Sequence, residues 1–277
     1  MTELPRIPLA GVIGAPVAHS KSPLLFRHWL DTYRLPGHYV PLHVDPGDFE
    51  EVLRSLPKLG FVGANVTIPH KTALIGIADD VTDRARQIGA ANTVTFRDGR
   101  IHADNTDGYG FIENLLQSAP EWSAAAGPAL ILGAGGAARA VIHAMLEAGA
   151  PEIWLANRSR DKAEALADHF GARVIPVDWA GIATHLHAAH TVINTTSLGM
   201  AGKTELTLDL DGLHSGQLVT DIVYTPLETR LLREASARGC KTVDGLGMLL
   251  HQAVPGFERW FGQRPEVTEA LRRTILS

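Results

Sequence analysis

Short apolar runs alternate with amphipathic segments along the first hundred residues of the chain. An apolar run of about four to eight residues is typical of a buried strand, and apolar residues spaced three to four positions apart are typical of one helix face. The pattern predicts strands over 9–14, 38–44 and 61–67 and helices over 23–35, 46–59 and 70–80. This alternation favours an α/β lobe with a mostly parallel sheet.

A β-hairpin is predicted next, because the strand-like stretches 92–96 and 100–104 are separated only by the sequence Arg-Asp-Gly. Asp-Gly is a frequent hairpin turn. The spacing of apolar residues over 107–118 then indicates a helix.

A second α/β series begins at residue 129. Its expected strands are 129–133, 152–157, 173–177, 190–196 and 217–223, and its expected helices are 137–150, 160–170, 229–239 and the tail from about residue 244. No segment repeats with a fixed period, which favours two α/β lobes over a solenoid.

Composition and charge narrow the class of protein. The chain has 277 residues, 45% of them hydrophobic and 20% charged, which is ordinary for a soluble globular protein of one large or two small domains. Its single cysteine, Cys240, excludes an internal disulfide framework and fits a reducing cytoplasm. A net charge of −5 without a basic stripe argues against a nucleic-acid partner, so local groups would have to hold an anionic substrate. No apolar run reaches membrane-spanning length, and the N-terminal MTELPRIPLAG lacks the pattern of a secretory signal.

The sequence GAGGAARA, residues 133–140, matches a dinucleotide-binding fingerprint. It follows the apolar strand directly and opens a helix, the context that the fingerprint requires. Gly133 allows the tight turn, Gly135 lets the backbone approach a pyrophosphate, and Ala138 allows close packing of helix on strand. The alternative is a tight turn without a ligand, but the context favours a bound cofactor.

The end of the next strand indicates which cofactor binds. NAD-binding proteins usually carry an acidic residue about 20 positions after the fingerprint, whereas this strand ends at Asn157 and is followed by Arg158, Ser159 and Arg160, with Lys162 beyond. Cations and a hydroxyl suit the 2′-phosphate of NADP. The alternative is a solvated basic helix start, which is unfavourable because positive charge opposes the helix dipole there.

Polar residues gather at strand ends and loops of the first lobe: Ser20, Ser22, Asn65, Thr67, Asn92 and Asp107. Lys71 is expected in the first turn of the helix after the third strand. Ligands bind outside the carboxyl ends of parallel strands, which favours a binding site. Each residue also has a structural interpretation: Ser22 as a helix cap, Asn92 or Asp107 as a turn former, and Lys71 as a solvated lysine.

The combined motifs resemble the shikimate dehydrogenase family across nearly the whole chain. They are GAPVAHSKSP (14–23), NVTIPHK (65–71), GAANT (89–93), NTDG (105–108), GAGGAARA (133–140), NRS (157–159), NTTSLGM (194–200), DIVYTP (221–226) and DGLGMLLHQA (244–253). Lys162 stands where NADP-preferring members often have arginine, and Ala15 and Ala91 replace common Asn and Val. The resemblance implies reversible NADPH-linked reduction of 3-dehydroshikimate to shikimate in aromatic amino-acid biosynthesis.

The resemblance also implies roles for individual residues. Ser20, Ser22 and Tyr224 would hold the substrate carboxylate, and Lys71 and Asp107 would form the catalytic pair. The substrate hydroxyls would be held by Asn65, Thr67, Asn92, Asp107 and Gln252. The cofactor would contact Gly133, Ala134, Gly135, Gly136, Ala137, Asn157, Arg158, Ser159, Lys162, Thr195, Thr196, Ser197, Ile222, Gly245 and Met248. Because Gln252 must reach a site built by the first hundred residues, the expected domains are 1–106 plus 243–277 for substrate and catalysis, and 107–242, of Rossmann type, for NADP.

Two rival functions remain at this point. A quinate or aminoshikimate dehydrogenase has the same architecture, although it would more often carry Thr at position 22 or an acid after Asn157. A non-catalytic NADP-sensing regulator would have lost Lys71 or Asp107, and both are present. No metal is expected, because His185, His187 and His190 lack a completing ligand and are interpreted as surface or packing residues. The assembly is expected to be a monomer or a homodimer.

Overall fold

The structure, a computed structural model, describes residues 7–277. The first six residues of the stretch considered for a secretory signal fall outside this range. Contacts divide the chain into two compact units: a first unit that runs up to Thr106 and resumes over Gln252–Ser277, and a second unit of Asp107–His251. The assignment of substrate and cofactor to domains with limits at 106 and 243 stays a prediction.

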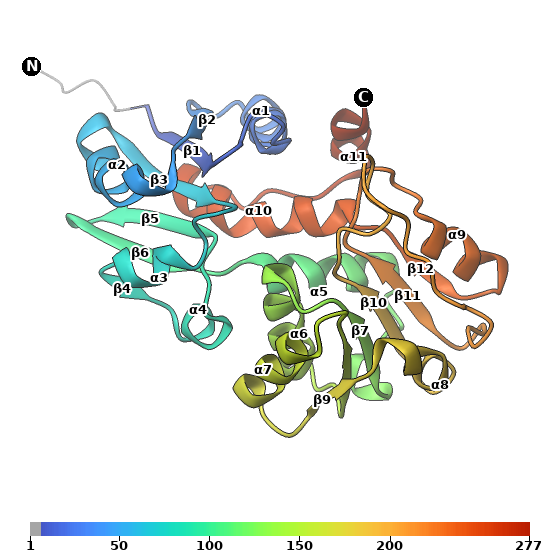
Figure 1. The fold of residues 1–277 in the computed structure, drawn as a ribbon. Coiled ribbons are helices and arrows are strands. Elements are labelled where there is room, and N and C mark those ends of the chain that lie inside the picture. Colours follow the sequence, from blue (N-terminus) through green and yellow to red (C-terminus); the bar gives the residue numbers. More distant parts are fainter. Residues whose placement is uncertain (1–6) are drawn as a thin grey trace, which may run out of the picture. The chain divides into compact units, whose positions relative to one another are not determined.

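The first unit contains a six-stranded sheet in the order β2-β1-β3-β5-β6-β4 (Figure 1). Its strands are β1 (Leu9–Gly14), β2 (His38–His43), β3 (Phe61–Val66), β4 (Asp80–Val81), β5 (Thr93–Arg97) and β6 (Arg100–Asp104). Strand β1 pairs in parallel with β2 and β3, and β4 with β6, whereas β5 is antiparallel to both of its neighbours. The predicted hairpin is therefore confirmed, and it reverses the direction of one strand in an otherwise parallel sheet.

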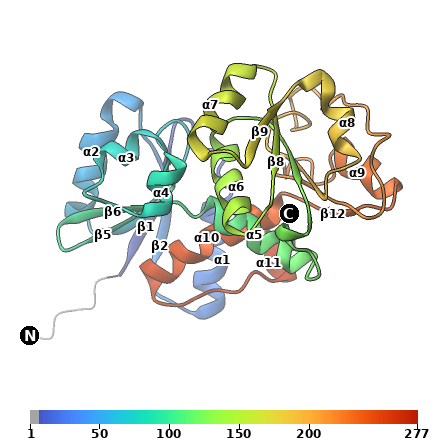
Figure 2. The same cartoon turned by 90° about the horizontal axis from the view of Figure 1, so that it is seen from below.

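Helices cover both faces of this sheet. They are α1 (Ser22–Tyr33), α2 (Phe49–Ser55), α3 (Ala73–Ile77), α4 (Asp83–Ile88), α11 (Glu269–Leu276) and the C-terminal half of α10 (Leu246–Phe261), with 3₁₀ turns at Pro46–Asp48 and Leu56–Leu59. Figure 2 shows α2, α3 and α4 on one face and α1, α10 and α11 on the other. Phe49 and Leu53 of α2 pack with Ile13 on the first face, and Phe26 and Phe257 pack together on the second.

Two elements of the first unit differ from the sequence expectation. The helix expected over 70–80 is only the five-residue α3, and β4 follows it. Helix α4 was not predicted: Thr82 caps it by accepting from the Ala85 N–H at 3.4 Å, and Gly89, with φ +74°, ends it after six residues. Elements this short span too few turns to show a helical period.

The second unit contains an all-parallel sheet in the order β12-β11-β10-β7-β8-β9 (Figure 1). Its strands are β7 (Ala129–Leu132), β8 (Ile153–Ala156), β9 (Val174–Val177), β10 (Thr191–Asn194), β11 (Leu218–Asp221) and β12 (Lys241–Val243). Its helices are α5 (Asp107–Ser118), α6 (Gly136–Glu147), α7 (Arg160–Phe170), α8 (Ile182–Leu186), α9 (Arg230–Ala237) and the start of α10, with 3₁₀ turns at Ala124–Ala126 and Trp179–Gly181. This strand order is that of a Rossmann fold, so the predicted fold class is confirmed. Strand β12 and helix α8, each five residues or shorter, were not predicted.

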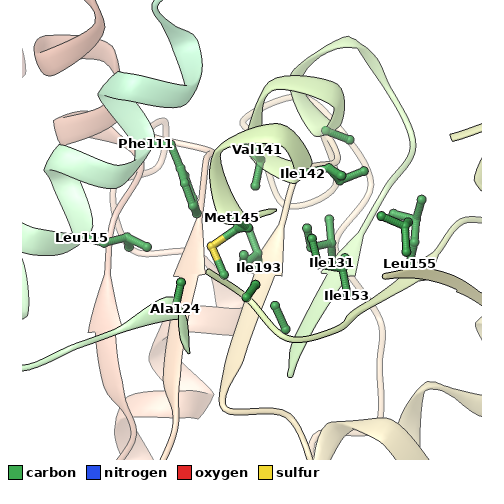
Figure 3. Packing of buried hydrophobic residues seen from close by; sticks show 14 of the residues in the cluster. Phe111, Leu115, Ala124, Ile131, Val141, Ile142, Met145, Ile153, Leu155 and Ile193 are labelled. Atoms are coloured by element: carbon green, nitrogen blue, oxygen red, sulfur yellow. The ribbon is translucent and has the colours of Figure 1, made fainter. Parts of the chain in front are cut away.

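Alternate residues of β7 supply the two cores of this unit, because successive side chains of a strand point to opposite faces. Ile131 packs with Phe111 of α5 and Val141 of α6 in the core that Figure 3 shows. Leu130 and Leu132 belong to the core on the other face, which α8 and α9 cover. Fully buried strands of this kind read as continuous apolar runs, which is why ALIL was recognisable in the sequence.

Candidate active site

The carboxyl ends of β1 and β3 lie in contact. The Thr67 N–H donates to Ile13 O at 2.9 Å, and the Ala15 N–H donates to Ile68 O at 3.1 Å. A Cβ on Gly14 would lie 2.5 Å from Thr67 Cγ2, so a side chain at position 14 would separate the two strand ends. The serine-rich turn after β1 and the polar stretch after β3 are therefore brought to one edge of the sheet.

Ser22 is not a helix cap. Helix α1 begins at Ser22 itself, with Lys21 at the cap position and no side-chain cap, while the Ser20 hydroxyl accepts from the Ser22 N–H at 3.3 Å. The Ser22 hydroxyl hydrogen-bonds instead to the hydroxyl of Tyr39 on β2. Burial raises the pKa of Tyr39, and the Ser22 hydrogen bond opposes this only in part.

Asn65, at the end of β3, is buried and fully held. Its Oδ1 accepts from the Tyr39 hydroxyl at 2.8 Å. Its Nδ2 donates to Asn92 O at 3.3 Å and to Thr93 Oγ1 at 3.2 Å. These partners fix the orientation of the amide, since the nitrogen faces two acceptors and the oxygen faces a donor.

Asn92 is oriented in the same way at the start of β5. Its Oδ1 accepts from the Thr106 N–H at 2.8 Å and from the Thr93 hydroxyl at 2.9 Å. Its Nδ2 donates to Gln252 Oε1 at 3.3 Å, across 160 positions of sequence. Of the predicted substrate residues, Ser20, Ser22, Asn65, Thr67, Asn92 and Gln252 thus belong to the first unit. The contact with Gln252 comes from the return of the chain along α10.

Lys71 lies in the turn between β3 and α3, two residues before the helix starts at Ala73, and not in its first turn as expected. The turn is held on both sides. The Ala91 N–H donates to Lys71 O at 2.9 Å, and the buried ring of His70 bonds to Val44 O at 2.8 Å while stacking on Phe49. The backbone that carries Lys71 is therefore fixed to three neighbouring segments.

Asp107 and Tyr224 belong to the second unit. Asp107 follows Thr106 directly and opens helix α5, where it is buried. A Cβ on Gly108 would lie 2.9 Å from Ala140 O, so this glycine lets α5 pack closely on α6. Burial raises the pKa of Tyr224. The pairing of Lys71 with Asp107 stays a prediction.

The fingerprint turn of the second unit has the geometry that a dinucleotide requires. Gly133 has φ +106°, a left-handed conformation that favours glycine, and a Cβ there would lie 2.8 Å from Thr196 Cγ2. A Cβ on Gly135 or Gly136 would meet nothing within 4 Å, so space is open above the start of α6. A pyrophosphate would fit there, against the free N–H groups of a twelve-residue helix.

Arg158 and Arg160, which follow β8, differ in their ion pairs. Arg160, which opens α7, forms ion pairs with Glu164 and Asp178. Arg158 is exposed and forms no ion pair within residues 7–277. Asn157 accepts from the Ala134 N–H at 3.2 Å and so ties this loop to the fingerprint turn. Of the two arginines, Arg160 is already paired with carboxylates, whereas Arg158 forms no such pair within residues 7–277.

The other predicted cofactor residues of the second unit follow β10 and β11 or lie at the start of α10, with Gly245 directly before it. Thr195 donates to Leu132 O at 2.8 Å, next to the fingerprint turn, whereas Ser197 is exposed. A Cβ on Gly245 would lie 2.4 Å from the carbonyl of Ile222, so only a glycine allows this approach. Met248 and Ile222 are half-buried against the same core cluster. Thr195, Ser197, Ile222 and Gly245 thus follow the carboxyl ends of β10, β11 and β12.

Three family models match the chain in order. They describe a shikimate dehydrogenase substrate binding domain over residues 12–94, a shikimate / quinate 5-dehydrogenase over 116–202, and a shikimate 5′-dehydrogenase C-terminal domain over 245–276. The "Shikimate dehydrogenase (NADP(+))" of Ruegeria sp. (strain TM1040) is 62% identical over 98% of this chain and 99% of its own length. The chain belongs to the shikimate dehydrogenase family.

Solved structures related to this shikimate dehydrogenase family member include two different dehydrogenases. The shikimate 5-dehydrogenase of Thermus thermophilus, in complex with NADP(H) and shikimate, is 37% identical with a TM-score of 0.86 and covers 96% of this chain and 99% of its own. The quinate dehydrogenase of Corynebacterium glutamicum, in complex with NAD, is 32% identical with a TM-score of 0.90 and covers 97% of this chain and 98% of its own.

Within residues 7–277, none of the helices combines the length and the apolar character needed to cross a membrane.

Sequence analysis missed two buried groups of this shikimate dehydrogenase family member. The first is Tyr39. The second is Asp221, which ends β11 and accepts from Asn194 Nδ2 at 2.9 Å and Thr229 Oγ1 at 2.8 Å. Burial raises the pKa of Asp221, and its hydrogen bonds lower it in part. An acid that directly follows an apolar strand was the signal that could have drawn attention to it.

Proposed function

We propose that this chain is an NADP-dependent shikimate dehydrogenase, which reversibly reduces 3-dehydroshikimate to shikimate in aromatic amino-acid biosynthesis. The observation that carries the proposal is the amide network of the buried Asn65 and Asn92 and the half-buried Gln252 at the carboxyl edge of the first sheet. Buried, oriented amides beside a hydroxyl-rich turn suit a small ligand with several hydroxyl groups and one carboxylate. Family membership over nearly the whole chain supports the same substrate.

The serine turn holds the substrate carboxylate. Ser20 and Ser22 lie one residue apart, and their hydroxyls are donors of the kind that bind a carboxylate. Tyr224 supplies a further hydroxyl, whose pKa is raised by burial. The hydroxyl groups of the substrate are held by Asn65, Thr67, Asn92, Asp107 and Gln252.

Lys71 and Asp107 carry the acid–base chemistry. NADPH, when bound at the fingerprint turn, supplies the hydride for the carbonyl carbon. The Lys71 ammonium delivers a proton to the carbonyl oxygen in reduction, and its amine withdraws that proton in oxidation. The Asp107 carboxylate holds the lysine and a neighbouring substrate hydroxyl in line. The presence of both residues favours an enzyme over an NADP-sensing regulator.

NADP is preferred for two reasons. The Arg158 guanidinium, which forms no ion pair in the described chain, binds the 2′-phosphate. No acidic residue stands after Asn157 to bind a ribose hydroxyl. Quinate oxidation is the second candidate activity, since a quinate dehydrogenase has a TM-score of 0.90 against this chain. Serine at position 22, where relaxed enzymes more often carry threonine, favours shikimate. The sequence has a single cysteine, Cys240, whose free thiol is buried, and this suits a reducing cytoplasm.

Steady-state rates with shikimate and with quinate, each with NADP and NAD, test the proposal. We expect the highest kcat/KM for shikimate with NADP. A higher kcat/KM for quinate with NAD would assign the chain to quinate oxidation, and binding of NADP without turnover of either acid would favour the regulator.

A further inference from the structure

The hydrogen bond between Asn194 and Asp221 lies where the chain leaves the second sheet twice. These two residues end the neighbouring parallel strands β10 and β11, are paired in the register, and are both buried. Asn194 Nδ2 donates to Asp221 Oδ1 at 2.9 Å. The segments that follow the two residues, 195–200 and 222–226, contain several residues of the proposed site. The bond therefore joins the origins of both segments.

Asn194 orders the first of these segments. Its Oδ1 accepts from the Thr196 N–H at 3.0 Å and from the Thr196 hydroxyl at 2.7 Å. Its Nδ2 donates to Leu198 O at 3.3 Å as well as to Asp221. The Leu198 N–H in turn donates to Thr196 Oγ1 at 3.1 Å. The orientation of the amide is fixed, because its nitrogen faces two acceptors and its oxygen faces two donors.

Asp221 orders the second segment with the same carboxylate. Its Oδ1 also accepts from the Val223 N–H at 3.0 Å, and its Oδ2 accepts from the Thr229 hydroxyl at 2.8 Å. Thr229 is the N-cap of α9, where its oxygen accepts from the Leu232 N–H at 3.5 Å. One buried carboxylate thus connects the segment after β10, the segment after β11 and the helix that follows them.

We propose that Asp221 is a positioning residue that holds segments 195–200 and 222–226 in the arrangement that the cofactor binds. The inference rests on the proposed cofactor contacts, which in these segments are those of Thr195, Thr196, Ser197 and Ile222. It assigns Asp221 no contact with the cofactor or with the reacting atoms. Segments that are ordered in advance do not have to be ordered by the cofactor, so its affinity is higher. The effect of Asp221 should therefore appear in cofactor affinity and in the order of both segments without cofactor.

The first test compares two variants of Asp221. Asp221→Ala leaves the Asn194 amide and the Val223 N–H without this acceptor, whereas Asp221→Asn keeps an oxygen for both, and its amide can donate to Thr229 Oγ1. Equilibrium titration gives Kd for NADP without turnover. We expect Kd to rise about tenfold in Asp221→Ala, the equivalent of ordering about one or two side chains, and by less than about threefold in Asp221→Asn.

Gln217→Ala is the matched control, because Gln217 is equally buried and directly precedes β11, at the end of the strand opposite to Asp221. Its side chain also makes three hydrogen bonds: Nε2 donates to Leu186 O at 2.6 Å and Ala189 O at 2.7 Å, and Oε1 accepts from the His214 N–H at 2.8 Å. Both alanine variants should lower Tm, but only Asp221→Ala should weaken NADP binding. An equal rise in Kd in both would trace the effect to lost stability and overturn the inference.

The second test measures positioning in the protein without cofactor. We expect amide hydrogen exchange in segments 195–200 and 222–226 to be at least about tenfold faster in Asp221→Ala and close to wild type in Asp221→Asn. Unchanged exchange in both segments of Asp221→Ala, or an unchanged Kd for NADP, would overturn the inference. If wild type binds NAD and not NADP, the proposed cofactor preference fails, and the same titrations with NAD still decide the role of Asp221.

Discussion

Arg259 donates from Nη2 to Oδ2 of Asp104 at 2.6 Å, and this ion pair joins residues 155 positions apart. Arg84 forms two further bonds to the same carboxylate, at 2.7 and 2.6 Å. The Asp104 carbonyl accepts from the Asn92 N–H at 2.9 Å. The last turn of α10 is thereby tied to the strand end that positions Asn92.

This carboxylate makes stability depend on pH. Burial raises the pKa of Asp104, but hydrogen bonds from Arg84, Arg259 and Thr82 outweigh burial and hold the pKa at about 2. A pKa below the unfolded value means that the stabilisation is complete above about pH 4 and is lost as the pH falls toward 2. Its size is about 2 kcal/mol.

Urea unfolding between about pH 2 and 6 measures this contribution. We expect Asp104→Asn to be less stable than wild type at pH 6, with the difference shrinking toward pH 2. Asp98→Asn is the control, since the exposed Asp98 forms only one ion pair within residues 7–277, with Arg97 at 3.7 Å. A wild-type to Asp104→Asn difference that stays constant over this range would contradict the assignment.

Replacing Lys71 by alanine should lower kcat by about 10² to 10⁴, the usual effect of losing a general acid–base group. KM for shikimate should change less, because the serine turn and the amides supply most of the binding. Steady-state kinetics at saturating NADP measure both constants, with the exposed Lys58→Ala as a control. An unchanged kcat would remove Lys71 from the mechanism.

The double variant Ser20→Ala and Ser22→Ala should weaken shikimate binding, since each hydrogen bond to a charged group contributes about 1.5–3 kcal/mol. NADP affinity should stay nearly constant, because the fingerprint turn lies in the second unit. Titrations with each ligand separate the two effects. Unaltered shikimate affinity would leave the serine turn a purely structural feature.

Arg158→Ala should reduce kcat/KM for NADP and barely affect NAD, with a discrimination of about 2–4 kcal/mol from one or two charge-assisted bonds. Ser159→Asp should shift preference further toward NAD, because its charge repels a phosphate and accepts from a ribose hydroxyl. Arg160→Ala is the matched control, since that guanidinium is already paired with Glu164 and Asp178. Equal losses for both cofactors in Arg158→Ala would mean that Arg158 supports the fold.

Local chemistry made several features readable from the sequence. The fingerprint turn needs small residues at Gly133, which approaches Thr196, and at Ala138, which is buried. These two positions lie within six residues of each other in the sequence. The β5–β6 hairpin is specified by its own turn. The serine turn and the amide of Asn65 were predicted as site residues from their places at strand ends.

Other features depended on the tertiary structure. In the sequence, Tyr39 looks like any other aromatic residue of a strand. Its hydrogen bond to Asn65, 26 positions away, depends on the order β2-β1-β3 in the sheet. Helix α4 and strand β12 are too short to show a period, and neighbouring elements stabilise them. The bond that Asn92 donates to Gln252 and the bond that Arg259 donates to Asp104 arise because α10 returns along the first sheet. A residue type and its spacing specify a turn or a strand, whereas the partner of a buried polar group is decided by which distant segments pack against it.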